Sequence, residues 1–371
     1  MSSRKIRIKN IKKQLSNSPE TWVLNGRADS MDCFISLQKF LLEQKEKKSD
    51  ISLYKKTKDI DVPYHASIFH FLMYHSFYPK VAFIKIFENS VVFGAFKGRY
   101  HNEIEFSFPT NLNSKSSLIN LKKILSDKNI ISLIDELKID KILLRNIDDE
   151  FLKIIRKNND KNNLEIESIS ELKYSVYDIK KTLSLKGKKY ANLRWHLNKF
   201  HKEKHKIEIV DIEDTLKAII HLIGQWKKKA IEERDFSFID VRSDKIGAKI
   251  GAKYKKYNDN IDDFLNSENI LTRVLKVDGV VSAFNLGYPL GIFQKRNIFA
   301  HAIGIADISI PHLAEYAQYD FWRQIKKKGY RLVNDGPTWR NSLETYKNKF
   351  RPIDKKRYFW VKLSTDNLKK Q

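Results

Sequence analysis

The stretch Arg273-Val-Leu-Lys-Val-Asp-Gly-Val-Val-Ser-Ala-Phe284 predicts a β-hairpin, with Asp278-Gly279 as its two-residue turn. An earlier stretch, Ile84-Lys-Ile-Phe-Glu-Asn-Ser-Val-Val-Phe-Gly-Ala-Phe96, aligns with it when one gap is allowed. A further strand pattern follows each hairpin, over 104–108 in the first half and over 298–306 in the second, and a helical pattern comes after each of these. The repetition predicts two copies of one mixed α/β unit.

Outward from the hairpins, we expect a basic N-terminal arm over 1–20, a first domain over 21–176 and a second domain over 177–371. Each domain is expected to hold a mixed, mostly antiparallel sheet flanked by helices, which places the chain in the α/β (α+β) class. The helices predicted in the second domain cover 183–205, 215–231, 311–328 and 342–350.

Composition narrows the class of protein. The 371 residues are 42% hydrophobic, which is enough for packed cores, and Cys33 is the single cysteine. One cysteine allows neither an intramolecular disulfide nor a cysteine zinc site. Apolar runs are strand-sized, and no signal-peptide pattern follows Met1, so we expect a cytoplasmic protein that lies at most peripherally on a membrane.

The charge balance points to anionic partners. Lys and Arg number 70 against 45 Asp and Glu, a net charge of +25. Such a surplus attracts nucleic acid, an anionic membrane surface or a phosphorylated cofactor. The alternative is a compositional bias, because a chain rich in Lys, Ile and Asn places lysine on solvated faces without any partner.

Cations are densest over 180–206, where ten Lys or Arg stand against one acid, Glu203. The apolar residues of this segment recur at helical spacing: Tyr190, Leu193, Leu197 and Phe200. One helix face can therefore pack while the cations project elsewhere and contact phosphates. A solvated helix in a lysine-rich protein is the competing interpretation.

The histidines of this segment do not predict a metal site. His196 and His201 are five residues apart, and neither cysteine nor a cluster of acids accompanies them. We therefore expect no metal.

A second polar segment runs from Val333 to Pro352. A strand is expected to end at Val333 and to deliver Asn334 and Asp335 into a Gly-Pro turn, and a helix then carries Lys347. Polar residues between a strand and a helix commonly line a site in α/β folds. The alternative is an ordinary connection in which Asn334 and Asp335 cap the turn.

Together the two segments resemble the phosphatidylglycerol lysyltransferase C-terminal domain family. Leu185-Lys-Gly-Lys-Lys-Tyr190 with Arg194 and Phe200 is similar to one motif of that family, and Asn334-Asp-Gly-Pro337 with Leu343, Lys347 and Phe350-Arg-Pro352 is similar to another. The resemblance covers 177–363. It implies tandem GNAT-like domains and kinship with transferases in which an acceptor attacks the ester of a charged tRNA. Aminoacyl-tRNA is then the co-substrate, and no cofactor or metal is required.

The resemblance also implies roles for residues. Lys188, Lys189 and Arg194 would contact tRNA phosphates. Asn334, Asp335 and Lys347 would line the reaction site, with Asp335 accepting a proton from the incoming amine and Lys347 holding the oxyanion or the terminal phosphate. Trp226 and Arg340 complete the expected substrate-binding residues. The competing view is that Asp335 and Lys347 pair with each other and brace the turn.

The acceptor and the donor stay open. Glu344 stands where the family often has Arg, and we expect no membrane-spanning segment, so phosphatidylglycerol is disfavoured against a peptide, a small molecule or another lipid. Gly304 lies in His301-Ala-Ile-Gly-Ile-Ala306, a weak match to the GNAT pantetheine loop, and would bind a cofactor only if acyl-CoA is the donor. The alternatives are thus an acyl-CoA-dependent N-acyltransferase and a non-enzymatic basic protein that binds tRNA or a membrane on a GNAT scaffold.

Overall fold

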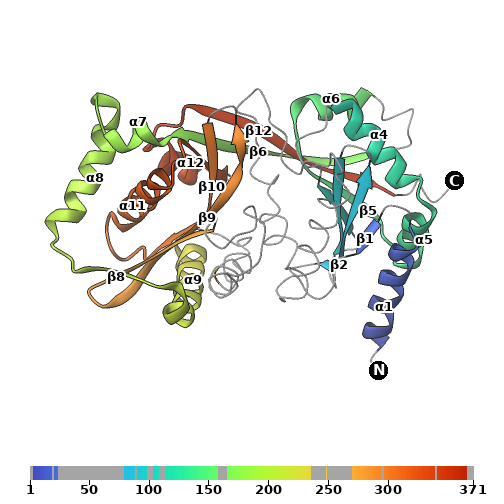
Figure 1. Ribbon diagram of the computed structural model, residues 1–371, viewed down its shortest axis with the longest axis horizontal. Coiled ribbons are helices and arrows are strands. Elements are labelled where there is room, and N and C mark those ends of the chain that lie inside the picture. The colour runs from blue at the N-terminus through green and yellow to red at the C-terminus, as the bar shows by residue number, and fades with distance from the viewer. Residues whose placement is uncertain are drawn as a thin grey trace. The chain divides into compact units, whose positions relative to one another are not determined.

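The computed structural model describes residues 3–18, 21–23, 79–87, 90–97, 103–107, 114–157, 165–234, 248, 270–293, 296–338 and 341–365. By their packing, these residues form two compact units (Figure 1). The first contains the described residues up to 173 together with 357–365, and the second contains 174–356.

The first unit is a sheet with strand order β1-β2-β3-β4-β5-β12, flanked by helices. Its neighbouring strands are antiparallel except for β4 and β5, which are parallel. Its elements are α1 (Ser3–Ser16), β1 (Thr21–Val23), β2 (Pro79–Phe87), β3 (Ser90–Lys97), β4 (Glu103–Ser107), α4 (Ser114–Leu125), α5 (Lys128–Glu136), β5 (Lys141–Ile147), α6 (Asp149–Lys157), the first part of β6 (Ile166–Asp178) and most of β12 (Asp354–Ser364).

The predicted N-terminal arm is a helix that belongs to the first unit. Ile11 and Leu15 of α1 are 1% and 0% exposed and lie in the unit's hydrophobic core. They are four residues apart and therefore share one helix face. Because only these two apolar residues stand among many basic ones, the sequence shows no recognisable amphipathic pattern for this helix.

The second unit has the strand order β6-β11-β10-β9-β8-β7. The pairs β7–β8, β8–β9 and β9–β10 are antiparallel, and β10 runs parallel to β11. Its further elements are α7 (Ile179–Ser184), a 3₁₀ turn (Lys188–Tyr190), α8 (Ala191–Lys202), β7 (Ile207–Val210), α9 (Ile212–Arg234), β8 (Leu271–Val277), β9 (Val280–Phe293), β10 (Arg296–Ala306), α11 (Leu313–Lys327), β11 (Leu332–Thr338) and α12 (Asn341–Asn348).

The same order of elements occurs in both units. Three consecutive antiparallel strands, β2-β3-β4 or β8-β9-β10, are followed by helix and then by a strand parallel to the third, β5 or β11. The two predicted hairpins are present, and Asp278 and Gly279 have φ values of 51° and 84°, as a two-residue turn of the primed type requires. The predicted α/β class with mixed, mostly antiparallel sheets flanked by helices is confirmed.

The end of the chain differs from the expected division, which assigned all of 177–371 to the second domain. Residues 359–364 of β12 pair antiparallel with 141–147 of β5, so the last strand returns to the first unit. Strand pairing between segments so far apart in the chain leaves no local signal in the sequence.

The single helix expected over 183–205 is wrong, because the chain turns sharply after α7. Leu185 and Gly187 have φ values of 52° and 88°, in the left-handed region that a right-handed helix excludes. The segment therefore divides into α7, the 3₁₀ turn and α8.

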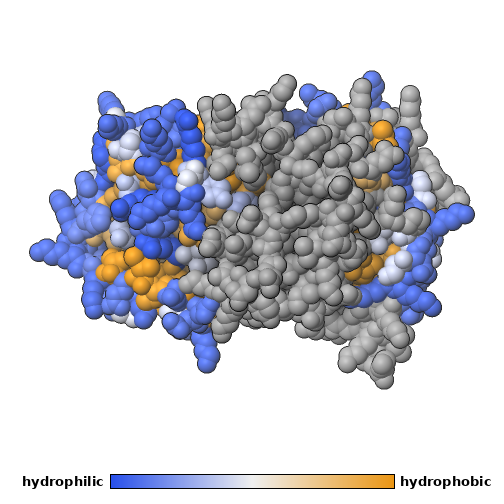
Figure 2. Space-filling model, in the orientation of Figure 1, coloured by the Kyte–Doolittle hydropathy of each residue, from blue (hydrophilic) through white to orange (hydrophobic). Residues whose placement is uncertain are grey.

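Helices α7, α8 and α11 pack together against the sheet of the second unit (Figure 1). Leu193 and Leu197 of α8 contact the same core as Phe321 and Trp322 of α11 and Phe299 of β10. Figure 2 shows that hydrophilic residues cover most of the described surface of this unit in that view, with apolar patches between them. No helix in the described part of the chain is long and apolar enough to span a membrane.

Candidate functional site

The two motif segments, 185–200 and 334–352, are far apart in the chain but pack against each other in the second unit. Arg351 Nε donates a hydrogen bond to the carbonyl of Lys189 (2.7 Å), and Thr182 Oγ1 donates to the carbonyl of Phe350 (3.1 Å). Phe350 and Tyr190 lie in one hydrophobic core. The loop before α8 and the end of the C-terminal segment therefore form one structural feature.

Lys188 and Lys189 lie exposed on the 3₁₀ turn that opens this loop. The Nζ of Lys189 lies 5.2 Å from the centre of the Tyr190 ring. Because Arg351 fixes the backbone at Lys189, the two ammonium groups project from an anchored loop.

Arg194, the third predicted phosphate contact, binds the backbone of this loop. Its side chain folds back along α8, and Nη1 donates to the carbonyls of Leu185 and Gly187, the latter at 2.9 Å. The guanidinium thus closes the loop that carries Lys188 and Lys189, and contact with a phosphate through its other N–H groups stays a prediction.

An exposed aromatic ring accompanies these cations. Trp195 is 50% exposed, and the Nζ of Lys199 lies 5.7 Å from the centre of its ring. A solvent-facing indole beside lysines suits stacking with an unpaired base. Trp195 is not among the predicted binding residues, although it falls outside the apolar helix face of Tyr190, Leu193, Leu197 and Phe200, and that spacing is the signal that could have found it.

The expected reaction site lies where the parallel strands β10 and β11 stop pairing. Their ladder joins 298–300 to 332–334, and β11 continues to Thr338 instead of ending at Val333. Asn334 and Asp335 are consequently 2% and 9% exposed rather than presented on an open turn. Asn334 Oδ1 accepts a hydrogen bond from the Gly336 amide (3.0 Å), which fits the capping alternative.

Lys347 is buried against this strand end. Its Nζ donates to three successive carbonyls, those of Asp335, Gly336 (3.0 Å) and Pro337 (3.2 Å), and lies 4.0 Å from Asp335 Oδ2. Burial lowers the pKa of Lys347, and the nearby Asp335 carboxylate opposes that shift. The structure therefore brings Asn334, Asp335 and Lys347 together, with the ammonium occupied by backbone carbonyls.

Asp335 also contacts a residue that the sequence analysis did not assign to the site. Its Oδ1 lies 3.1 Å from His301 Nδ1, and its Oδ2 accepts from Gln318 Nε2 at 3.4 Å. His301 Nε2 lies 2.9 Å from Asn285 Oδ1. A histidine paired with a carboxylate can hold or transfer a proton, so His301 and Asp335 are the acid–base candidates of this unit.

The remaining predicted site residues lie elsewhere or are not described. Gly304 is exposed on β10, and a Cβ added there would lie 2.9 Å from the His301 ring, so the glycine makes room for that ring. Trp226 is half-buried in α9, which packs against β8, β9 and β10. Arg340 lies outside the described residues. The roles of all three in binding stay predictions.

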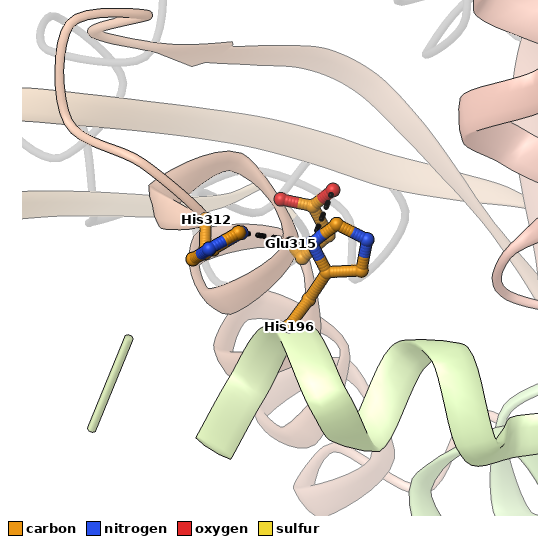
Figure 3. Close-up of side chains that lie close together, drawn as sticks. All are labelled: His196, His312 and Glu315. Atoms are coloured by element: carbon orange, nitrogen blue, oxygen red, sulfur yellow. Dashed lines mark hydrogen bonds and ion pairs between the residues drawn. The ribbon is translucent and has the colours of Figure 1, made fainter. Parts of the chain in front are cut away.

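One further cluster has the composition of a metal site. Among the described residues, His196, His312 and Glu315 each offer a ligand atom, and these atoms lie within 4.8 Å of one another (Figure 3). They come from α8 and from the start of α11, which the chain separates by more than a hundred residues.

Comparisons with known proteins show similarity of fold. No protein-family profile and no curated protein matches the sequence. Among solved structures, a conserved protein of unknown function from Bacteroides thetaiotaomicron has a TM-score of 0.58 at 16% identity, with 86% of this chain and 97% of that chain covered.

Two further solved structures relate to the resemblance found in the sequence. The C-terminal domain of a protein described as a lysylphosphatidylglycerol synthetase, from Agrobacterium fabrum, has a TM-score of 0.45 at 13% identity, over 86% of this chain and 91% of that one. A tandem GNAT protein from the clavulanic acid biosynthesis pathway has a TM-score of 0.48 at 7% identity, over 93% of this chain and 98% of that one. At such identities the likeness concerns the fold alone.

Proposed function

We propose that this chain is an aminoacyltransferase that moves an amino acid from charged tRNA to a lipid, peptide or small-molecule acceptor. The observation that carries the proposal is the packing of the two motif segments against each other. It sets Lys188 and Lys189 on a loop whose backbone is anchored to the segment that also contains Asp335 and Lys347.

The cationic surface fits the donor. Exposed lysines neutralise backbone phosphates without reading sequence, and Trp195 offers a stacking surface for an unpaired base near the 3′ end. Arg194 holds the lysine-bearing loop closed through the carbonyls of Leu185 and Gly187. These features support a tRNA more directly than they support a small cofactor.

The transfer itself needs few groups. The acceptor amine, or a hydroxyl in the case of phosphatidylglycerol, attacks the carbonyl carbon of the aminoacyl ester. A C–N or C–O bond forms, the C–O bond to the terminal ribose breaks, and the ribose hydroxyl leaves with the proton given up by the acceptor. Asp335, paired with His301, is the proposed acceptor of the amine proton. Lys347 is proposed to hold the strand end that positions Asp335, because its three N–H donors are directed at carbonyls.

A transfer assay with defined donors tests the proposal. Purified protein is given tRNA charged with labelled amino acids or labelled acetyl-CoA. The acceptor probes are ethanolamine, diglycine and phosphatidylglycerol vesicles. We expect label to pass from tRNA to at least one acceptor, and Asp335→Asn to reduce that rate by roughly 10²–10⁴-fold while tRNA binding persists. Glu344→Gln, a carboxylate removed from the surface of α12, is the matched control and should keep the parent rate.

The other outcomes identify the alternatives. Transfer from acetyl-CoA but not from tRNA would replace the proposal with an acyl-CoA-dependent N-acyltransferase. Binding of tRNA with no transfer to any acceptor would make the chain a non-enzymatic tRNA-binding protein.

A further inference from the structure

The cluster of His196, His312 and Glu315 has no part in the transfer step proposed above, although its neighbour Trp195 belongs to the proposed tRNA surface. His196 projects from α8 toward the start of α11, where His312 and Glu315 lie within one turn of each other (Figure 3). The two Nδ1 atoms of the histidines are 2.8 Å apart, and His196 Nδ1 lies 3.5 Å from Glu315 Oε1. Three side chains of types that bind zinc, two imidazoles and one carboxylate, thus converge from two packed helices.

The fold holds the two imidazoles in place. His312 has a φ of 64°, a left-handed conformation that a non-glycine residue adopts rarely, immediately before α11 begins. The Trp195 ring meets both imidazoles edge to face, with centroids 4.9 Å from His196 and 5.1 Å from His312. A residue in an uncommon backbone conformation at such a cluster is a reason to ask for a function.

The distances fit a tetrahedral ion after a small adjustment. Ligand nitrogens and oxygens at ordinary zinc distances lie about 3.3 Å from one another. Two of the three separations, 2.8 and 3.5 Å, fall on either side of that value, and all three ligand atoms lie within 4.8 Å of one another. The short contact between two nitrogens requires one shared proton, and an ion placed between them would replace it.

The surrounding charges are compatible with a cation. Lys349 Nζ lies 2.7 Å from Glu315 Oε1. A carboxylate has two oxygens and about four lone-pair sites, so Glu315 can accept from Lys349 and still ligate.

We propose that His196, His312 and Glu315 bind one divalent transition-metal ion of the zinc class, with the fourth coordination position left to water or an added ligand. Two imidazoles and one carboxylate favour Zn²⁺ or Co²⁺ over Mg²⁺ or Ca²⁺, which prefer oxygen ligands only. The proposal does not depend on the transfer reaction. No metal was expected from the spacing of His196 and His201 within one segment, because His312 and Glu315 lie far from that segment in the sequence.

A second histidine cluster provides the matched control. Asp278 binds His205 through Nδ1 (2.8 Å) and Glu203 binds it through Nε2 (2.9 Å). The two carboxylates therefore lie on opposite sides of the ring and cannot share an ion with one of its nitrogens. His205→Ala should leave metal binding unchanged.

The experiment titrates EDTA-treated full-length protein with Zn²⁺ in a calorimeter and with Co²⁺ in a spectrophotometer, where fewer than six ligands give intense visible bands. We expect one ion per chain, bound at least about tenfold more weakly by His196→Ala, His312→Ala and Glu315→Gln. Absence of both signals from the folded parent protein would overturn the proposal, and this does not depend on any variant folding. Parent-like binding by all three variants, or loss of binding in His205→Ala, would overturn it as well.

Discussion

Reversing the charges of Lys188 and Lys189 tests whether the loop before α8 holds tRNA. Both side chains are exposed, and the backbone that carries them is anchored by Arg351 and Arg194, so Lys188→Glu/Lys189→Glu should keep the fold. Each phosphate contact contributes about 0.7–0.9 to the slope of log affinity against log salt. Two lost contacts therefore reduce the slope by about 1.4–1.8.

The change in slope has a direct consequence for affinity. When the salt concentration rises fourfold, the tRNA affinity of the parent protein falls more than that of the variant. The ratio of the two losses is 4 raised to the difference in slope, which is about 7–12. The deficit of the variant should thus be large at low salt and shrink by about tenfold over a fourfold rise in salt. A filter-binding titration of charged tRNA at several salt concentrations measures both quantities.

The control carries the same change in charge at another place. Lys122 and Lys123 are also adjacent and exposed, on α4 of the first unit. Either double reversal takes two charges from +2 to −2, and so takes the net charge from +25 to +21. If the salt dependences of the two variants coincide, the effect is one of total charge, and the loop loses its assigned role. If the plot of log affinity against log salt has the same slope for Lys188→Glu/Lys189→Glu as for the parent protein, these lysines contact no phosphate.

Two further predictions concern stability. Lys347→Met should lower the free energy of unfolding by about 3–5 kcal/mol, because three carbonyls lose a buried charged donor. The control Lys355→Met removes an exposed ion pair with Glu344 and should cost less than about 1 kcal/mol. Urea unfolding measures both variants, and equal effects would contradict the bracing role of Lys347. Hydrogen bonds to Asp278 and then Glu203 raise the pKa of His205, so its stabilising contribution is complete below about pH 6.5 and is lost as the pH rises through the raised pKa. The urea midpoint of His205→Ala should therefore fall below that of the parent at pH 5.5 and approach it at pH 9. The control His221→Ala, at an exposed position in α9, should show no such trend. A difference in urea midpoint between His205→Ala and the parent that grows toward pH 9 would contradict the prediction.

The sequence predicts those parts of the fold whose signals are local. Alternating apolar residues on either side of Asp278-Gly279 specify a hairpin within a dozen residues, and Gly329, with a φ of 87°, ends the helix before it as expected. The break after α7 was predictable only in part. Gly187 is a local signal for it, whereas the left-handed Leu185 is a residue type that rarely adopts that conformation.

The candidate sites depend on contacts that no local pattern records. His301 meets Asp335 because β10 and β11 pair in parallel, and His196 meets His312 because α8 packs against α11. The polar segment 333–352 and its motif resemblance grouped Asp335 with Lys347, and the two side chains lie 4.0 Å apart. The sequence did not show that β11 continues past Val333 and buries them.

The contacts of Asp335 and Lys347 separate the two roles that the sequence left open for this pair. An ammonium has three donors, and those of Lys347 are all within hydrogen-bond reach of carbonyls, so stabilising an oxyanion would first require breaking one of these bonds. A buried charge that loses a partner is costly, which opposes such an exchange. Asp335 has about four lone-pair sites, and His301 and Gln318 contact one oxygen each. These contacts favour the bracing role for Lys347, and they leave Asp335 with free lone-pair sites, which is compatible with the role as proton acceptor proposed for it.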